Sequence, residues 1–275
     1  MSDEAAQPEI RQELRESVLW LTIDRPAAGN ALTPANRTVI IDALSEADRD
    51  PGIRAVVITA AGERMFCTGA DLRSPQPGPP RPEGAPDRIA GDVARGIRIS
   101  AQRLITAVLD CEKPVIAAVN GTTAGMGVQL ALACDFVIAA STARFIEIFV
   151  RRALVPDSGA AYLLPRLIGV ARAKELLMLG EDVSAERALE IGLIYKVVAP
   201  EELLAEATAL STRLAAGPTR ALALTKWLVN RSLDASRATS FEDEAIAQDL
   251  NMHTADGQEG VASFVERRPA EYKGW

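Results

Sequence analysis

Two glycines flank a methionine where the chain is expected to expose main-chain donors. Gly125-Met126-Gly127 follows a turn and precedes a helical stretch over residues 128–133. Glycines let a ligand approach the backbone closely, and the first turn of a helix offers unpaired N–H groups and a favourable dipole. The segment predicts a backbone site for an oxygen that gains negative charge. The alternative is that the glycines only permit a tight turn and helix packing.

A carboxylate with two possible roles lies further along, in Val155-Pro156-Asp157-Ser158-Gly159. A single carboxylate in a largely apolar pocket suits proton transfer, because desolvation makes it more basic. Aspartate in such a turn also commonly caps a helix, here one that begins near Gly159. Asp157 is therefore a candidate base and a candidate helix cap.

The amino-acid composition argues against several kinds of catalytic and binding site. His253 is the only histidine in 275 residues, which argues against Ser-His-Asp or Cys-His catalysis and against a multi-histidine metal site. A net charge of −7 argues against a nucleic-acid surface. Cys67, Cys111 and Cys134 have no CxxC spacing and no secretory leader is visible, so we expect reduced thiols and a cytoplasmic protein. No apolar stretch is long enough to span a bilayer.

The elements that must position these residues alternate between strand and helix up to about residue 200. We expect strands at residues 18–23, 54–59, 115–119, 136–139 and 193–198, and a first helix that begins at Thr33-Pro34. The sequence predicts a flexible N-terminus over residues 1–16, an α/β core over 17–200 and a helical module over 201–275. Residues 74–86 hold six of the sixteen prolines and are predicted to form a lid or a surface insertion.

Four segments, in order, resemble those of the enoyl-CoA hydratase/isomerase (crotonase) superfamily. They are residues 24–32, 66–72 (Phe-Cys-Thr-Gly-Ala-Asp-Leu), 113–135 (Lys-Pro-Val-Ile-Ala-Ala-Val through Cys-Asp) and 143–169, and residues 259–264 resemble the last helix of the family. The match covers roughly residues 17–270. It implies an α/β fold of the crotonase (ClpP/crotonase) type, a spiral of ββα units with a C-terminal helical trimerisation module. It also implies an acyl-CoA substrate, no separate cofactor or metal, and a homotrimer or a dimer of trimers.

The resemblance also assigns site residues. The backbone N–H groups of Ala70 and Met126 correspond to an oxyanion hole for the thioester oxygen, where one donor is typically worth about 10²–10³ in rate. The coenzyme A-binding positions correspond to Arg25, Ala70, Asp71, Leu72, Lys113 and Phe264. The simpler interpretations are that Arg25 and Lys113 are solvated cations, that Asp71 orders the turn and that Phe264 packs in the core. Lys273 lies where relatives reach a neighbouring subunit.

The chain departs from the family pattern at the general base. Gln129 and Phe149 stand where hydratases of the family carry glutamates, and Glu147 is two residues from the second position. We expect Glu147 on a helix surface or as a second carboxylate. A missing acid or base costs about 10²–10⁴ in rate, so efficient hydration is not expected.

The segment around Asp157 resembles the ring-1,2-epoxyphenylacetyl-CoA isomerase branch instead. It predicts an acyl-CoA isomerase in which Asp157 carries the proton. A hydratase with atypical catalytic residues, a thioester hydrolase and a non-catalytic acyl-CoA binder are the alternatives.

Overall fold

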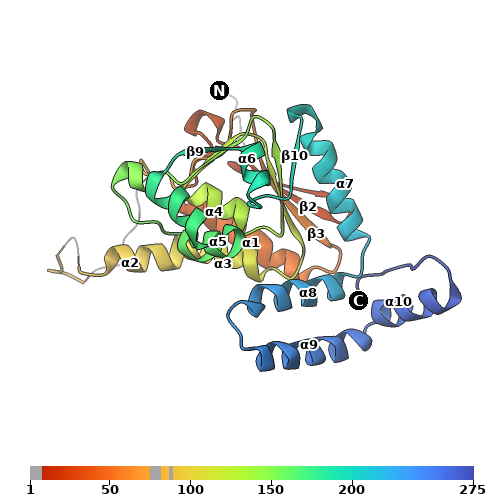
Figure 1. The fold of residues 1–275 in the computed structure, drawn as a ribbon. Coiled ribbons are helices and arrows are strands. Elements are labelled where there is room, and N and C mark those ends of the chain that lie inside the picture. The colour runs from red at the N-terminus through yellow and green to blue at the C-terminus, as the bar shows by residue number, and fades with distance from the viewer. Residues whose placement is uncertain (1–7, 75–81, 87–88) are drawn as a thin grey trace.

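Two β-sheets and the helices packed on them form the body of the molecule (Figure 1). The computed structural model describes residues 8–74, 82–86 and 89–275. The main sheet contains, in spatial order, β1 (Ile10–Arg15), β2 (Val18–Ile23), β3 (Ala55–Ala60), β5 (Val115–Val119), β7 (Phe136–Ala140) and β10 (Lys196–Val198). β1 is antiparallel to β2, and the other pairs are parallel.

A smaller sheet of three-residue strands lies beside the main one and carries the candidate site. Its order is β4 (Met65–Cys67), β6 (Thr122–Ala124), β8 (Arg144–Ile146) and β9 (Asp182–Ser184). β4, β6 and β8 are parallel, so the turns that follow them meet at one edge. Ala70 follows β4, Met126 follows β6 and Glu147 follows β8. Three chain segments are thereby brought together.

Helices cover both faces of the main sheet, with α7 (Leu203–Ala215) on one face and α1 (Pro34–Arg49), α3 (Arg103–Asp110) and α4 (Met126–Leu132) on the other. The other α-helices of the described residues are α2 (Asp92–Ile97), α5 (Ala160–Leu179), α6 (Ala185–Glu190), α8 (Thr219–Ser232), α9 (Arg237–Met252) and α10 (Ala255–Glu266). The predicted start of α1 is confirmed: Asn36 N donates to Thr33 Oγ1, and Pro34 is the first helical residue. The predicted break near Gly169 is a kink inside α5.

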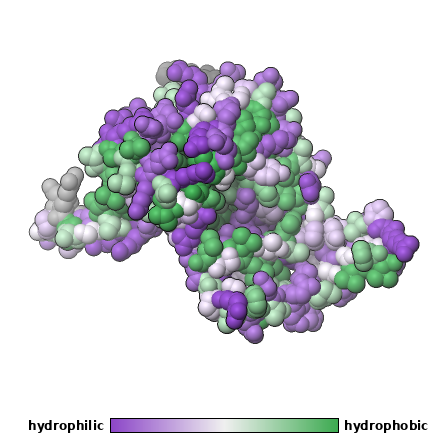
Figure 2. Space-filling view, in the orientation of Figure 1, coloured by the Kyte–Doolittle hydropathy of each residue, from purple (hydrophilic) through white to green (hydrophobic). Residues whose placement is uncertain are grey.

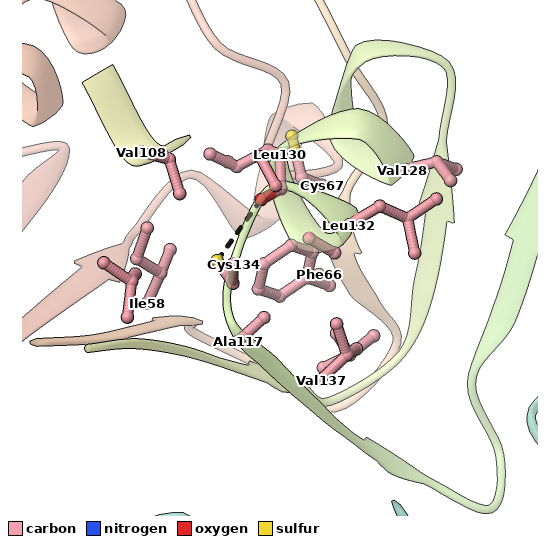
Figure 3. Close-up of a cluster of buried hydrophobic side chains, with 14 of the residues drawn as sticks. Ile58, Phe66, Cys67, Val108, Ala117, Val128, Leu130, Leu132, Cys134 and Val137 are labelled. Carbon is pink, nitrogen blue, oxygen red and sulfur yellow. Dashed lines mark hydrogen bonds between the residues drawn. The ribbon is translucent and has the colours of Figure 1, made fainter. Parts of the chain in front are cut away.

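The core separates into two layers, one on each face of the main sheet. Alternate residues of the buried strands point to opposite faces, as the strand period requires. Phe66, Leu130 and Val137 belong to the larger layer, shown in Figure 3, where α4 packs over the sheet. Trp20 and Ile116 belong to the smaller layer, which α7 covers on the other side. This packing fixes α4, whose first residue is Met126.

Three helices after Pro218 extend from the body as a separate arm (Figure 1). Lys226 on α8 joins this arm to the core, because its buried ammonium group donates to Asp135 Oδ2 at 2.9 Å and to Val108 O at 3.0 Å. The chain end folds back: Asp256 accepts hydrogen bonds from the N–H groups of Lys273 and Gly274. Among the described residues, no helix is both long and apolar enough to cross a membrane.

One predicted boundary is wrong. Residues 10–15 are not a flexible end but form β1, whose backbone pairs along the whole of β2. Only Ile10 of this edge strand is buried, so its sequence carries little hydrophobic signal. After β10 the chain forms helices, as predicted. One of them, α7, places Leu203 and Ala207 against the main sheet.

Candidate active site

The two main-chain nitrogens expected to form an oxyanion hole lie in adjacent segments. A Cβ built on Gly69 would stand 3.5 Å from the nitrogen of Met126 and 3.0 Å from the carbonyl oxygen of Ala124. Gly69 has φ +97°, a conformation that favours glycine. The turn holding Ala70 therefore presses directly on the first residue of α4, with no room for a side chain between them.

Both nitrogens are also free to donate. Leu32 N donates to Gly69 O and Asp71 N donates to Leu32 O, which leaves the N–H of Ala70 between them unused. Met126 is the first residue of α4, where N–H groups lack a helical acceptor. Within the described ranges, neither N–H donates to another residue of the chain. The arrangement can hold an oxygen that carries negative charge.

Asp157 lies on the same side of the molecule as a buried cation. Arg37 on α1 is buried, and its Nη1 lies 3.9 Å from the sulfur of Met126. Burial lowers the pKa of Arg37, and the nearby Asp157 carboxylate opposes that shift. Sequence reasoning missed Arg37, because an arginine at an α1 position gives no signal of burial. Arg37 thus contacts Met126 directly and interacts electrostatically with Asp157.

Asp157 does not cap the helix that follows it. The N-cap residue of α5 is Gly159, at φ +88°, and its first turn has no side-chain cap bond among the described residues. The Asp157 carboxylate accepts a hydrogen bond from the Ser158 hydroxyl at 2.7 Å. The capping interpretation is therefore wrong, and among the residues that the structure describes Ser158 is the one side chain that donates to the half-buried Asp157 carboxylate.

Glu147 is not on a helix surface, as one interpretation held. It follows β8, is only 2% exposed, and accepts a hydrogen bond from Gln129 Nε2 at 2.8 Å. Burial raises the pKa of Glu147 to about 7, and the bond from Gln129 opposes that shift. Phe145, Glu147 and Phe149 are all buried, with less buried residues between them. This period of two in the sequence was the available signal that Glu147 points inward.

The aromatic ring of Phe149 lies next to Gly125, the residue before Met126. A Cβ on Gly125 would lie 3.8 Å from the ring of Phe149 and 3.3 Å from Ile148. The position where hydratases of the family carry a glutamate therefore presents an aromatic ring. This ring makes the wall beside the two free N–H groups apolar.

Arg25 and Asp71 form a network that orders the turns around Ala70. Arg25 donates to Glu9, to the carbonyl oxygen of Ala31 and to Asp71, where Nη2 lies 3.2 Å from Oδ2. The pKa of Asp71 is lowered most strongly by a hydrogen bond from the backbone N–H of Arg73. Asp71 thus organises the turn, as the simpler interpretation held. The neighbouring Leu72 is 79% exposed and borders the site from outside.

One expected coenzyme A-binding residue, Lys113, is not brought to this place. Lys113 precedes β5, whereas Arg25 follows the parallel strand β2, so they lie at opposite edges of the main sheet. Lys113 is buried, and its Nζ lies 3.3 Å from Asp50 O. Phe264 on α10 is 84% exposed, so the core-packing interpretation is wrong. Much of the expected lid, residues 75–81, lies outside the described residues.

No metal chemistry is indicated by the side chains that the structure describes. Within those ranges, no group of three or more His, Cys, Asp and Glu side chains is placed to hold a metal ion. The chemistry that the arrangement supports is proton transfer next to an oxygen held by two main-chain donors.

Comparisons with known proteins show the family of the chain. The model of the family described as enoyl-CoA hydratase/isomerase matches residues 13–275. The 1,2-epoxyphenylacetyl-CoA isomerase of Escherichia coli is 36% identical over 96% of this chain and 98% of its own length. The crotonyl-CoA hydratase of Syntrophomonas wolfei is 36% identical over 94% of this chain and 96% of its own. The crystal structure of an enoyl-CoA hydratase from Polaromonas sp. JS666 superposes with a TM-score of 0.85 at 37% identity, covering 96% of this chain and 99% of that one.

Proposed function

Because this chain belongs to the enoyl-CoA hydratase/isomerase family and has the crotonase fold of its relatives, we propose that it is an acyl-CoA isomerase. The proposed reaction moves a double bond or a proton through a thioester enolate. The observation that carries the proposal is the pair of adjacent, unused N–H groups at Ala70 and Met126 with Asp157 nearby. The coenzyme A belongs to the substrate, and no other cofactor is proposed.

The proposed role of the two N–H groups is to hold the thioester oxygen. Removing a proton next to a thioester moves an electron pair onto that oxygen, and preorganised donors stabilise it without having to reorient. The dipole of α4 adds to the same effect, because Met126 is its first residue. The glycines at 69 and 127 support this role, because a side chain at either position would meet the main chain of the neighbouring segment and push the two donors apart.

Asp157 is the proposed proton carrier. In the shift of a 3-enoyl to a 2-enoyl thioester, the carboxylate takes a proton from the α-carbon, and the electron pair moves onto the thioester oxygen. The resulting acid then returns the proton to the γ-carbon as the electron pair moves back and the double bond re-forms between the α- and β-carbons. One carboxylate suffices, so the apolar ring of Phe149 is compatible with this reaction but not with a second base there.

The experiment that tests this role replaces the main-chain donor. Proline is tolerated at the first position of a helix and has no N–H, so Met126→Pro removes one donor while α4 can still form. We expect the isomerisation of trans-3-hexenoyl-CoA to fall about 10²–10³-fold. Met126→Leu, which keeps the donor and the volume, should stay within a few-fold of the wild type. Equal rates in Met126→Pro and the wild type would contradict the proposal.

We also propose that the chain assembles as a homotrimer or a dimer of trimers through its C-terminal arm. A set of large apolar side chains on α9 and α10 is exposed: Phe241, Ile246, Leu250, Val261, Phe264 and Val265. Figure 2 shows hydrophobic side chains on this arm and a hollow between it and the body. That groove has a volume of about 1100 Å³ and is lined by residues of α5, α8 and α9. Apolar surface of this extent is typical of an interface.

A further inference from the structure

The first half of α5, which follows Asp157, is bonded to the C-terminal arm. On the arm the contact is made by Asp234, in the turn between α8 and α9. Its carboxylate accepts a hydrogen bond from the Tyr162 hydroxyl on one oxygen and pairs with the Arg166 guanidinium on the other. The guanidinium also lies over the Tyr162 ring, 3.5 Å from its centre. These three side chains form the α5–arm cluster, which the proposed isomerisation does not use.

The α5–arm cluster is a network and not an isolated surface pair. A single exposed ion pair contributes little, because water and side-chain motion compete with it. Here both carboxylate oxygens of Asp234 are bonded, and stacking on the Tyr162 ring restricts the Arg166 guanidinium to one orientation. The hydrogen bond from Tyr162, followed by that from Arg166, lowers the pKa of Asp234, so the carboxylate stays ionised at neutral pH. The cluster can therefore hold α5 in one position relative to the arm.

The turn that carries Asp234 is itself held in place. Asp234 N donates to Arg231 O at 3.0 Å. Arg231 Nε donates to Asp243 Oδ2 at 2.6 Å, which joins α8 to α9. The buried ammonium group of Lys226 anchors α8 on the body. Asp234 is thus a fixed point to which α5 is attached.

On the body, Asp157 is joined closely to the first turn of α5. Ala160 N donates to the carbonyl oxygen of Asp157 at 3.0 Å, and Tyr162 N donates to that of Gly159 at 2.9 Å. Ser158 is fully buried at φ +53°, a conformation that a non-glycine residue rarely adopts. Because this short turn has little freedom, we expect Asp157 to move together with Tyr162.

α5 is interrupted beyond this turn. Pro165 lies inside it and has no N–H to donate, and Gly169 has the non-helical angles φ +77° and ψ +160°. Residues 160–168 are thus a short segment that the rest of α5 does not hold straight. Leu164 packs this segment into the core on one side, and the residues of the α5–arm cluster lie on its exposed side. Core packing therefore fixes one side of the segment, and the α5–arm cluster fixes the other.

Next to the cluster, a groove separates α5 from the arm. The groove has a volume of about 1100 Å³ and is lined by Leu163 and Leu167 of α5 and by Ile246 and Leu250 of α9. Figure 2 shows the hollow between the arm and the body. Side chains do not fill this space, so apolar packing between α5 and α9 is incomplete. The hydrogen-bonded cluster connects the two where packing does not.

We propose that Asp234 is a positioning residue for the proposed reaction. Through Tyr162 and Arg166 it fixes the rotation of residues 160–168 and with it the place of the Asp157 carboxylate. The inference rests on the proposed function, because it requires Asp157 to carry the proton. That carboxylate has to reach both the α- and the γ-carbon of one thioester, and a misplacement of about 1 Å can cost about 10²-fold in rate. Asp234 exchanges no proton and acts only through α5.

A double-mutant cycle on the isomerisation of trans-3-hexenoyl-CoA tests the proposal. We expect Asp234→Ala to lower kcat about 10-fold and to leave KM within about two-fold, because the two N–H donors stay in place. In the Asp157→Asn background the same change should alter the residual rate by less than about two-fold, since no carboxylate remains to be placed. A merely structural residue would lower both rates by the same factor, and that result would overturn the proposal.

Two further variants show which part of the cluster acts. Tyr162→Phe keeps the ring and removes one hydrogen bond, so we expect kcat to fall about three-fold, again without effect in Asp157→Asn. Asp234→Glu keeps the charge and should recover part of the loss. The control is Glu244→Ala, an exposed acid of α9 that forms no ion pair with the residues described, and it should leave kcat unchanged. Wild-type kcat in both Asp234→Ala and Tyr162→Phe would also overturn the proposal.

Failure of the positioning role and failure of the proposed function give different results. If Asp157→Asn alone leaves isomerisation unaltered, the proposed function is wrong, and the positioning role with it. If Asp157→Asn lowers the rate about 10²–10⁴-fold but Asp234→Ala acts equally in both backgrounds, only the positioning role is refuted. Sedimentation velocity shows whether each variant keeps its assembly. Should Asp234→Ala dissociate, the same comparison between backgrounds is decided by Tyr162→Phe.

Discussion

The main chains of Cys67 and Gly127 are in direct contact at the end of β4. A Cβ built on Gly127 would stand 2.1 Å from the carbonyl oxygen of Cys67, a distance that real Cβ atoms do not reach. The contact joins the strand that leads to Ala70 with the helix that begins at Met126. The spacing of the two proposed donors therefore depends on the absence of a single methyl group.

We predict that Gly127→Ala separates these segments. The added methyl group meets main-chain atoms, which cannot rotate away, so the free energy of unfolding should fall by about 1–3 kcal/mol. The rate of isomerisation should fall by more than the loss of folded protein explains, because displaced N–H donors no longer stabilise the enolate. Urea unfolding and isomerase assays check both effects. Gly96→Ala on α2, where nothing lies within 4 Å, is the matched control and should be neutral or slightly stabilising.

Asp157→Asn should abolish proton transfer and leave the fold intact. The amide oxygen still accepts the bond from Ser158, but an amide cannot take up a proton at neutral pH. We expect isomerisation to fall about 10²–10⁴-fold with the unfolding midpoint nearly unchanged. Asp42→Asn, an exposed position on α1, serves as the control. Unaltered turnover in Asp157→Asn would show that the proton travels by another route.

The buried Glu147 predicts one contribution to the pH dependence of stability. Its pKa is raised from 4.5 to about 7 by burial. Between these values the unfolded chain has released a proton that the folded chain retains, so the contribution of Glu147 to stability is highest below pH 4.5 and is lost as pH rises through about 7. Compared with wild type, Glu147→Gln should gain up to about 3 kcal/mol more stability at pH 8 than at pH 4.5. Denaturation curves at both pH values measure this; parallel pH dependence in the two proteins would refute it.

Removing the Lys226 ammonium should loosen the C-terminal arm. Asp135 would lose its cation while still largely buried, and breaking one partner of such a pair typically costs about 3–5 kcal/mol. Burial raises the pKa of Asp135 and Lys226 opposes that shift, so the aspartate should become easier to protonate in Lys226→Met. Urea denaturation measures the loss. Lys174→Met, an exposed residue of α5, should cost less than about 0.5 kcal/mol.

The proposed assembly predicts that Phe264→Ser weakens oligomers. The side chain is 84% exposed, so its replacement should not disturb the protomer itself. Sedimentation velocity should show wild-type trimers or hexamers and a larger share of smaller species for the variant. Tyr195→Ser, an exposed aromatic residue away from the arm, is the control. A wild type that sediments as a monomer at all concentrations would contradict the assembly.

The sequence was most informative where one local signal decided the structure. The apolar runs of β3 and β5 and the Thr33-Pro34 helix start were predictable because burial on both faces and a helix cap leave clear patterns. The three-residue strands of the smaller sheet were not predictable, since so short a segment has no periodicity to read. β1 was missed because backbone pairing with β2, and not side-chain burial, holds it.

Some residues of the candidate site were predictable from the sequence and others were not. Glycine spacing pointed to Met126 and a Pro-Asp turn to Asp157, whereas Ala70 was assigned through the resemblance to the family. The pairing of Gln129 with Glu147 depends on β6 lying beside β8, and no pattern in the sequence shows that these two short strands pair. Lys113 was expected at the site but lies at the other edge of the sheet, because its position before β5 does not show which edge carries the site.

The central claim is that the N–H groups of Ala70 and Met126 hold one thioester oxygen. Isotope-edited infrared spectroscopy of crotonyl-CoA, labelled with ¹³C at the thioester carbonyl, measures this directly. We predict that the carbonyl stretch moves to lower frequency on binding than in water, and that Met126→Pro loses a large part of that shift. A bound carbonyl with the same frequency in water, in the wild type and in Met126→Pro would contradict the account.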